Sequence, residues 1–500
     1  MGDASSRWSS DVALLAYVAV ATVVVHLLTG HQYGFHRDEL AALDDSRHLA
    51  WGFVAYPPIT PFFGRLSLIL FGTSLTGFRF FPAVAESIAV VLTGLMAREL
   101  GARRAGQLVA AAAALPVCLA GGTLMQYVAF DYLCWVLAAY FVVRLLATGD
   151  ARWWLAIGAS IGLGMMTKYT IGFFVIGIVL GVLLTDARRY LGSKWLWLGV
   201  GLSALIFLPN LVWQALNHFV SLDFLREIHE RDVGIGRAQG FLLGQINMTL
   251  LAAPLWIAGL CFCLFSRDGR KFRMLGYMYI VPLLLFLIAK GRDYYLTPAY
   301  PMLYAAGSVW GERWLQSMSE AWAKVVTAVV WIALAADVGL AVAFFLPIAP
   351  VDSPWATRVF KMQGNFREEV GWQELVQTIV RVRDSLPSED RARAGILAGN
   401  YGEAGAVNLY GPSDGLPRAI SGMNSFWQRG YGDPPPEILI VVGISRPFLE
   451  RHFSDCQLAG HIWNRYGIAN EETVAHPDIY VCRGLRQSWP EFWANFRYYG

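Results

Sequence analysis

The apolar run VALLAYVAVATVVVHLL at residues 12–28 decides the class of fold. A helix that crosses a bilayer needs about 20 mostly apolar residues, and this run with its flanks has that length. Arg7 precedes the run and no convincing small-residue cleavage site follows it. We therefore interpret it as a first spanning helix and not as a signal peptide that is removed.

Similar apolar runs recur as far as Pro347, and the length rule predicts about eleven spanning helices. They lie at 12–30, 79–97, 106–121, 131–147, 153–167, 170–185, 195–213, 241–265, 274–289, 296–311 and 325–347. The composition agrees, because only 15% of the 500 residues are charged, against about 25% in soluble proteins. The net charge of +3 gives no reason to expect a nucleic acid as partner.

Lysine and arginine in the short loops predict the orientation, since cytoplasmic loops are enriched in both. With the N-terminus inside, every cytoplasmic loop is basic: Arg98/Arg103/Arg104, Arg144/Arg152, Arg188/Arg189/Lys194, Arg267/Arg270/Lys271/Arg273 and Arg313/Lys324. The two long loops, 31–78 and 214–240, then lie outside. So does the C-terminal segment, because the number of spans is odd.

The composition changes after Pro347. Residues 348–500 are polar and contain no spanning run, whereas residues 1–347 form the transmembrane part. Within 348–500, Ile396–Ala398 and Ile438–Val442 are typical of buried strands, and Trp372–Leu386 is typical of an amphipathic helix that Pro387 ends. We expect a small extracytoplasmic α/β domain, in which Cys456 and Cys482 could form a disulfide.

Asp38 and Glu39 follow the first span, in the motif HRDEL at residues 36–40. A carboxylate just outside a bilayer could act as a general base, or both could hold a divalent cation together with substrate phosphates. The alternative is an ordinary helix start, where acidic residues are common. The neighbouring Asp44 and Asp45 fit a solvated helix face better.

Other ionisable residues interrupt or flank the apolar runs. Asp131 lies at the outer end of a span, where it is either functional or a helix cap. Lys168 lies between two runs and suits a phosphate, or its chain reaches from the bilayer to the interface. The cations of Lys290–Tyr295 lie on the side that the positive-inside rule disfavours, which suits a lipid phosphate or an aromatic belt. In loop 214–240, Arg231 could hold phosphate with two hydrogen bonds.

In this order, these features resemble the GT-C superfamily of membrane glycosyltransferases. More narrowly, the chain resembles the bacterial protein O-mannosyltransferase-like family and its relatives, the aminoarabinose transferases that modify lipid A. The matching motifs are His36–Leu40, Tyr56–Ile59, Tyr127–Asp131, Gly164–Tyr169 and Lys290–Pro298. The resemblance implies a donor sugar linked to polyprenyl phosphate, and transfer at the outer face of a bacterial inner membrane. The acceptor would be a lipid, a protein or a polysaccharide.

The resemblance also implies the site residues. The catalytic candidates are Asp38, Glu39 and Asp131, and the substrate-binding candidates are His36, Tyr56, Lys168, Tyr169, His229, Arg231, Lys290, Arg292, Tyr294 and Tyr295. One position departs from the aminoarabinose transferases, in which a first-loop lysine that precedes a proline helps to hold the donor phosphate. Pro57 stands there in this chain, so Lys168, Arg231 or Lys290 must take that role.

We therefore expect an inverting glycosyltransferase with Asp38 as base. Three alternatives remain open at this stage. A transporter or lipid flippase would show interrupted helices in repeated halves, and no such symmetry is visible in the sequence. A glycan ligase or polymerase of the same superfamily would need a wider cleft. In a binding or scaffold protein, the outer acids and cations would not converge on one cavity.

Overall fold

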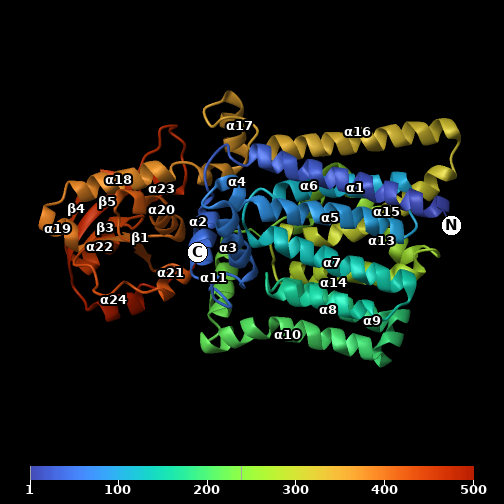
Figure 1. Ribbon diagram of the computed structural model, residues 1–500, viewed down its shortest axis with the longest axis horizontal. Coiled ribbons are helices and arrows are strands. Elements are labelled where there is room, and N and C mark those ends of the chain that lie inside the picture. The colour runs from blue at the N-terminus through green and yellow to red at the C-terminus, as the bar shows by residue number, and fades with distance from the viewer. Residues whose placement is uncertain (1, 238) are drawn as a thin grey trace.

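The chain folds into a long helical bundle with a smaller α/β unit at one end (Figure 1). This computed structural model describes residues 2–237 and 239–500. We call residues 2–347 the membrane part and residues 348–500 the C-terminal part. The N-terminal end of α1 lies at the end of the bundle far from the C-terminal part, and α2 and α11 lie between the bundle and that part (Figure 1).

Within the described residues, the membrane part contains helices and connecting loops but no β-strand. Its α-helices are α1 (Gly2–Thr29), α2 (Arg37–Arg47), α3 (Ile59–Phe71), α4 (Leu75–Phe78), α5 (Phe80–Glu99), α6 (Arg104–Gly121), α7 (Tyr127–Thr148), α8 (Trp153–Met165), α9 (Ile171–Leu184), α10 (Lys194–Leu216), α11 (Val220–Gly234), α12 (Phe241–Thr249), α13 (Ala253–Phe265), α14 (Arg273–Ile288), α15 (Tyr300–Gln316) and α16 (Glu320–Phe345). Short 3₁₀ turns join them at η1 (Asp186–Gly192), η2 (Leu250–Ala252), η3 (Arg270–Phe272) and η4 (Asp293–Ala299).

The predicted multispanning helical architecture is confirmed. Among the described residues, eight helices are long and apolar enough to cross a membrane, or nine if the bent pair α9 and η1 is one span. Each of the eleven predicted runs falls on helix, but α8 has only 13 residues and α15 has 17. A 13-residue helix is about 20 Å long, which is shorter than the hydrocarbon core of about 30 Å.

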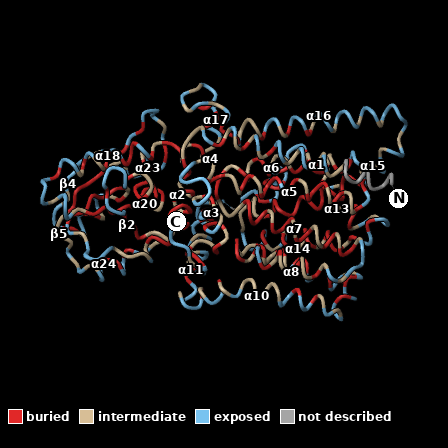
Figure 2. Tube along the Cα trace, in the orientation of Figure 1, coloured by how far each residue is buried: buried red, intermediate tan, exposed pale blue. Residues whose placement is uncertain are grey.

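Burial separates the inner helices of the bundle from the outer ones (Figure 2). In the apolar stretch of 18 residues within each helix, 67% of the residues are buried in α5 and in α7, against 17% in α10 and in α16. The outer helices expose large apolar side chains, such as Leu205 on α10 and Ile332 on α16. Contiguous exposed apolar surface of this extent is typical of a membrane contact.

The C-terminal part is built on one mixed sheet in the strand order β2-β1-β3-β5-β4. The strands are β1 (Ala394–Ala398), β2 (Ala419–Ser421), β3 (Ile438–Val442), β4 (Phe453–His461) and β5 (Asp478–Leu485). The first three pair in parallel, and β5 pairs antiparallel with β3 and β4. The accompanying helices are α17 (Pro354–Met362), η5 (Gly364–Glu369), α18 (Trp372–Asp384), α19 (Ser388–Arg393), α20 (Tyr401–Tyr410), η6 (Gly411–Asp414), α21 (Ser425–Gln428), α22 (Arg446–His452), α23 (Glu471–Val474) and α24 (Trp489–Asn495).

Alternate side chains of the sheet enter two different cores, because successive strand residues point to opposite faces. Ile396 and Ile440 pack with α18, α20 and residues of α2, including Leu40. Leu397 and Val441 pack instead with Phe492 of α24. One face of the sheet therefore shares its core with α2 of the membrane part.

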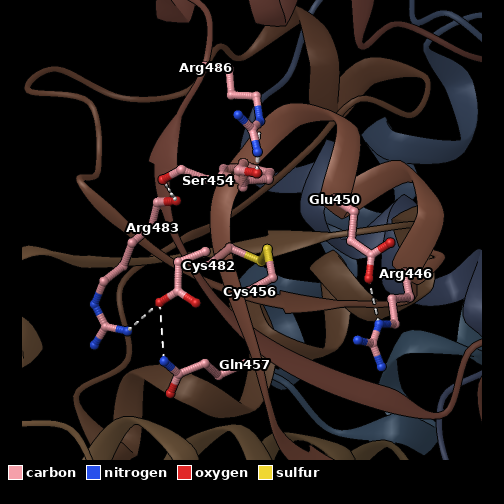
Figure 3. Close-up of a disulfide and its surroundings, with 10 residues drawn as sticks. Arg446, Glu450, Ser454, Cys456, Gln457, Cys482, Arg483 and Arg486 are labelled. Carbon is pink, nitrogen blue, oxygen red and sulfur yellow. Dashed lines mark hydrogen bonds and ion pairs between the residues drawn. A yellow bond between two sulfur atoms is a disulfide. The ribbon is translucent and has the colours of Figure 1, made fainter.

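The sequence leaves open whether Cys456 pairs with Cys482, and in the structure the two are bonded. The two residues face each other on β4 and β5, and their sulfur atoms form a disulfide (Figure 3). The remaining cysteines, Cys118, Cys134, Cys261 and Cys263, lie on helices of the bundle as free thiols.

Candidate functional site

The segment after α1 presents the acids Asp38 and Glu39 in opposite ways because of how α2 begins. His36 caps the helix, its Nδ1 accepts a hydrogen bond from the Asp38 amide, and the Glu39 side chain returns to accept one from the His36 amide. This capping box fixes both residues. It turns Glu39 into the protein and leaves 43% of the Asp38 side chain exposed.

Glu39 belongs to a buried ionic cluster. Its carboxylate accepts hydrogen bonds from Arg79 at 2.6 Å and from the Met125 amide at 2.9 Å. Arg79 also pairs with Glu369 of the C-terminal part at 3.1 Å. Burial raises the pKa of Glu369 to about 7, although Arg79 opposes this shift. The cluster fastens α2 to the start of α5 and to η5, so it leaves Glu39 no free position for a substrate or a metal ion.

Asp38 points the other way and meets two neutral donors. The Gln126 amide donates to Oδ2 at 2.9 Å, and the Tyr401 hydroxyl donates to Oδ1 at 2.7 Å. Tyr401 lies at the start of α20, more than 360 residues further along the chain. The carboxylate is thus held in one orientation while it remains accessible.

Asp38 lines a cavity of about 440 Å³ between the bundle and the C-terminal part. Cavities of this size hold small-molecule ligands. Its wall includes the predicted residues Asp38, Tyr56, Lys168, Tyr169, His229, Arg231, Lys290, Arg292 and Tyr295. Apolar side chains complete it, among them Phe173 of α9, Phe286 of α14 and Leu225 and Ile228 of α11. The lining therefore combines ionic groups with apolar side chains that suit a hydrocarbon chain.

Lys168 is held in a cage of tyrosines. Its Nζ lies 4.3 Å from the ring centroid of Tyr127, 4.0 Å from that of Tyr295 and 5.4 Å from that of Tyr294. Aromatic faces attract a cation in this geometry. Burial lowers the pKa of Lys168, against the opposing influence of Tyr294 and Asp131. Burial alone would raise the pKa of Tyr294, but Lys168 and Arg292 outweigh it and lower that pKa.

A second group of cations gathers around Asp232 of α11. Asp232 is ion-paired with Arg292 at 2.6 Å, with Arg237 at 3.4 Å and with Arg231 at 3.6 Å. Burial raises the pKa of Asp232, but its hydrogen bond to Arg292 and the three guanidinium charges outweigh this and lower it. One carboxylate among three guanidinium groups leaves an excess of positive charge beside the cavity, which favours an anion.

Asp131 lies behind the cavity wall and does not line it. It is buried in the second turn of α7, where Trp135 Nε1 donates to Oδ1 at 3.1 Å and the Thr170 hydroxyl to Oδ2 at 3.4 Å. The helix begins four residues earlier at Tyr127, so Asp131 is not a cap. It acts electrostatically on Lys168 and is placed to fix that cation.

Of the remaining predicted residues, His36 is buried as the cap of α2, and Tyr294 reaches the site through Lys168 and Arg292. Neither they nor Glu39 line the cavity. Within the described chain, no group of three or more His, Cys, Asp or Glu side chains could hold a metal ion. The carboxylates of Asp38 and Glu39 face different partners.

The sequence reasoning missed the residues that the C-terminal part contributes to this cavity. Tyr401, Asn424, Ser425 and Phe426 all line it. No local signal marks them, because their position depends on how distant elements dock. Gln126 was also missed, although it directly precedes the quoted motif Tyr127–Asp131.

The expectation of a solvated face at Asp44 and Asp45 is wrong. Both are buried, at 2% and 3% exposure, and Arg429 of the C-terminal part forms ion pairs with both. Asn408 also donates to Asp44 at 2.9 Å. The acids that appeared to face water are therefore docking contacts.

Comparison with known proteins supports the fold. Residues 55–213 match the family model described as dolichyl-phosphate-mannose-protein mannosyltransferase. No curated protein sequence matches the chain. Two structures of ArnT from Cupriavidus metallidurans match nearly end to end. The apo structure has a TM-score of 0.58 at 15% identity and covers 96% of this chain and 98% of its own. The structure with undecaprenyl phosphate has a TM-score of 0.56 at 17% identity and covers 94% and 97%.

The residues that the family model matches include some that line the cavity, among them Tyr56, Gln126 and Lys168. The structural match extends through the C-terminal part as well. The expected resemblance is thus confirmed: the chain has the GT-C fold of membrane glycosyltransferases, and residues 55–213 carry the sequence pattern of the dolichyl-phosphate-mannose-protein mannosyltransferase family.

Proposed function

We propose that this protein is an inverting glycosyltransferase that moves a sugar from a polyprenyl-phosphate donor to an acceptor hydroxyl. The observation that carries the proposal is the convergence on one cavity of an accessible carboxylate, Asp38, with the cations of Lys168, Arg231, Lys290 and Arg292. These groups come from four separate stretches of sequence. A general base and an anion site in one cavity are what this reaction requires.

In the proposed reaction, Asp38 takes the proton of the acceptor hydroxyl as its oxygen attacks the anomeric carbon. The new glycosidic C–O bond forms while the bond between the anomeric carbon and the phosphate oxygen breaks. The bonding electrons leave with the phosphate, so polyprenyl phosphate is the second product. Attack opposite the leaving group inverts the configuration at the anomeric carbon.

The cations would stabilise the charge that develops on the leaving phosphate. Lys168 is the leading candidate. Its ammonium group lines the cavity just before α9, and the tyrosine cage holds that group in place. Arg292, at the start of η4, and Arg231, on α11, add further donors to the cavity lining. This arrangement would compensate for Pro57, which stands where the aminoarabinose transferases carry a lysine. Asp131 then serves to hold Lys168 and does not meet the acceptor.

We place the reaction at the outer face of a bacterial cytoplasmic membrane. The basic loops predict that the C-terminal part lies outside, and the disulfide between Cys456 and Cys482 supports this, because disulfides persist in oxidising compartments. The cavity lies at the C-terminal-part end of the bundle, where a lipid-linked donor and a polar acceptor can meet.

The size of the cavity bears on the alternatives. A volume of about 440 Å³ suits a phosphate with one or a few sugars, whereas a glycan ligase or polymerase would need more room. A flippase would need a polar path through the bundle. The cations of the site instead line one cavity, which residues of the C-terminal part also line.

The test uses purified protein in detergent or liposomes with a panel of polyprenyl-phosphate sugars, both hexoses and pentoses. The proposal predicts that at least one donor is consumed and that polyprenyl phosphate appears in equal amount. The products also identify the sugar class and, when lipid, protein and polysaccharide acceptors are offered, the acceptor. If no donor in the panel is consumed while the protein moves lipid across the liposome bilayer, the transporter alternative replaces the proposal.

A further inference from the structure

The C-terminal part docks on the first outer loop through two helices, α20 and α2. Gly405 on α20 allows the close approach, since a Cβ there would lie 2.8 Å from the Leu40 carbonyl oxygen. Arg47 of α2 donates to the carbonyl of Asn408 on α20 at 2.9 Å. Arg429, which follows α21, pairs with Asp44 of α2. The two helices are therefore tied at several points, which fixes what lies at their first turns.

Tyr401 begins α20 and Asp38 lies in the first turn of α2. The Tyr401 hydroxyl donates to Asp38 Oδ1 at 2.7 Å. The guanidinium of Arg37 lies 5.3 Å from the centroid of the Tyr401 ring and is itself ion-paired with Glu471 of α23. The hydroxyl is thus held from both sides, by the docked helix and by the stacked cation.

From this juxtaposition we infer that Tyr401 is a positioning residue for Asp38, so that the C-terminal part completes the active site. This inference rests on the proposed function, in which Asp38 is the base. A hydrogen bond from a neutral phenol to one carboxylate oxygen stabilises the charged form. Together with the Gln126 amide, which donates to the other oxygen, it holds the carboxylate in one orientation at the cavity. Both effects favour a carboxylate that is ionised and aimed at the acceptor.

The inference separates two roles that the C-terminal part could have. If that part only stabilised the membrane part, the loss of one hydroxyl at Tyr401 would lower stability and leave the chemistry alone. If Tyr401 positions the base, its loss changes turnover and the dependence of turnover on pH, while donor binding at the cations stays intact.

The first arm of the test does not depend on activity. Thermal unfolding is measured for wild type, Tyr401→Phe, Asp38→Ala and the double variant. Phenylalanine keeps the ring under Arg37 and removes only the hydroxyl. We expect the two effects to be non-additive, because each substitution removes the same hydrogen bond. Additive effects would show that the contact is absent and would overturn the inference.

The second arm measures turnover with the donor that the panel identifies. For Tyr401→Phe we expect kcat to fall about tenfold or more, as for a hydrogen bond to a charged group, with the KM for the donor within about twofold of wild type. The acidic limb of the rate–pH profile should move to higher pH, because the ionised base loses a donor. An unchanged kcat and an unchanged acidic limb would overturn the inference.

Other groups act electrostatically on the same carboxylate or on Tyr401, and the comparison must hold them constant. They are His36, Arg37, Tyr56, Tyr127, Arg231 and Glu368. Tyr401→Phe leaves all of them in place, so a shift of the acidic limb reports the lost hydroxyl. Tyr410→Phe, at the far end of α20, is the matched control and should keep the wild-type profile.

The outcomes also distinguish this inference from the proposed function. If wild type consumes no donor, the proposed function fails, and the positioning role falls with it even where the unfolding measurements reveal the contact. If wild type is active and Tyr401→Phe behaves like Tyr410→Phe, only the inference fails.

Discussion

Asp38 and Glu39 are adjacent in the chain but have opposite chemistry at the scale of single residues. Arg79 and the Met125 amide occupy the carboxylate of Glu39, which has no exposed surface. Asp38 meets only neutral donors and keeps 43% of its side chain exposed. A general base must reach the proton that it accepts. For this reason the proposal assigns the base to Asp38 and a structural role to Glu39.

Lys168→Met tests the proposed phosphate site. Methionine keeps an apolar chain inside the tyrosine cage but removes the charge. We expect the Kd for polyprenyl phosphate to rise about 10- to 100-fold, as for one charge-assisted hydrogen bond. Binding is measured by titration of the purified protein with polyprenyl phosphate. Lys361→Met, an exposed lysine on α17, is the control. Equal affinity in both variants would remove Lys168 from the site.

At the scale of elements, buried charges fasten the C-terminal part to the membrane part in two places. One is Glu39–Arg79–Glu369, and the other is Arg429 with Asp44 and Asp45. Buried ion pairs contribute little net stability but are costly to break. These ion pairs instead determine how α20 meets α2, and hence where Tyr401 lies.

Glu369→Gln should make stability less dependent on pH. Burial raises the pKa of Glu369 from 4.5 to about 7. Because the folded-state pKa lies above the unfolded value, the stability that Glu369 contributes is complete below about pH 4.5 and is lost as the pH rises to about 7. Its slope reaches at most about 1.4 kcal/mol per pH unit. Thermal unfolding between those limits should show a smaller decline in the variant.

Two comparisons sharpen that measurement. The exposed Glu437→Gln should keep the wild-type slope. Asp45, whose pKa burial raises to about 6 against the opposing charge of Arg429, contributes equally in all three proteins. A slope in Glu369→Gln equal to that of wild type would contradict the assignment of a raised pKa.

Arg429→Ala tests the second fastening. Its loss leaves Asp44 and Asp45 buried without a counter-charge, which costs about 3–5 kcal/mol in the free energy of unfolding. The control is Arg446→Ala, since Arg446 is 69% exposed and pairs with Glu450 one turn along α22. Such a surface pair contributes about 0.5 kcal/mol or less. Denaturant unfolding that gave both variants the same stability would contradict a docking role for Arg429.

At the scale of the whole molecule, the bundle was largely predictable because apolar length alone identifies helices in a membrane. All eleven predicted runs are helical. Strands β1 and β3 were predicted from their short apolar runs, and α18 from its amphipathic pattern. Strand β4 is mostly exposed and lacks a continuous apolar pattern, and it was missed. Strand β5 was also missed, although its residues 479–482 are apolar and buried. The cations of the site were found because charge is rare in such a chain. Tyr401 and Arg429 were not, because their role arises only when segments more than 360 residues apart dock.

Topology is a further prediction at this scale. Asp352→Cys, just after α16 at the end of the membrane part, should react in intact cells with a maleimide that does not cross the membrane. Asp150→Cys, in the loop between α7 and α8, should react only after the cells are opened. Both positions are exposed. The opposite pattern would place the C-terminal part, and with it the cavity, on the cytoplasmic side.

The most direct test of the central claim compares Asp38→Asn with wild type, using the donor that wild type consumes. A positioned base contributes about 10²–10⁴-fold, so turnover should fall by that factor while the affinity for polyprenyl phosphate stays within about twofold. Asp352→Asn, an exposed acid outside the cavity, should turn over at the wild-type rate. Full activity in Asp38→Asn would contradict the claim that this carboxylate is the base.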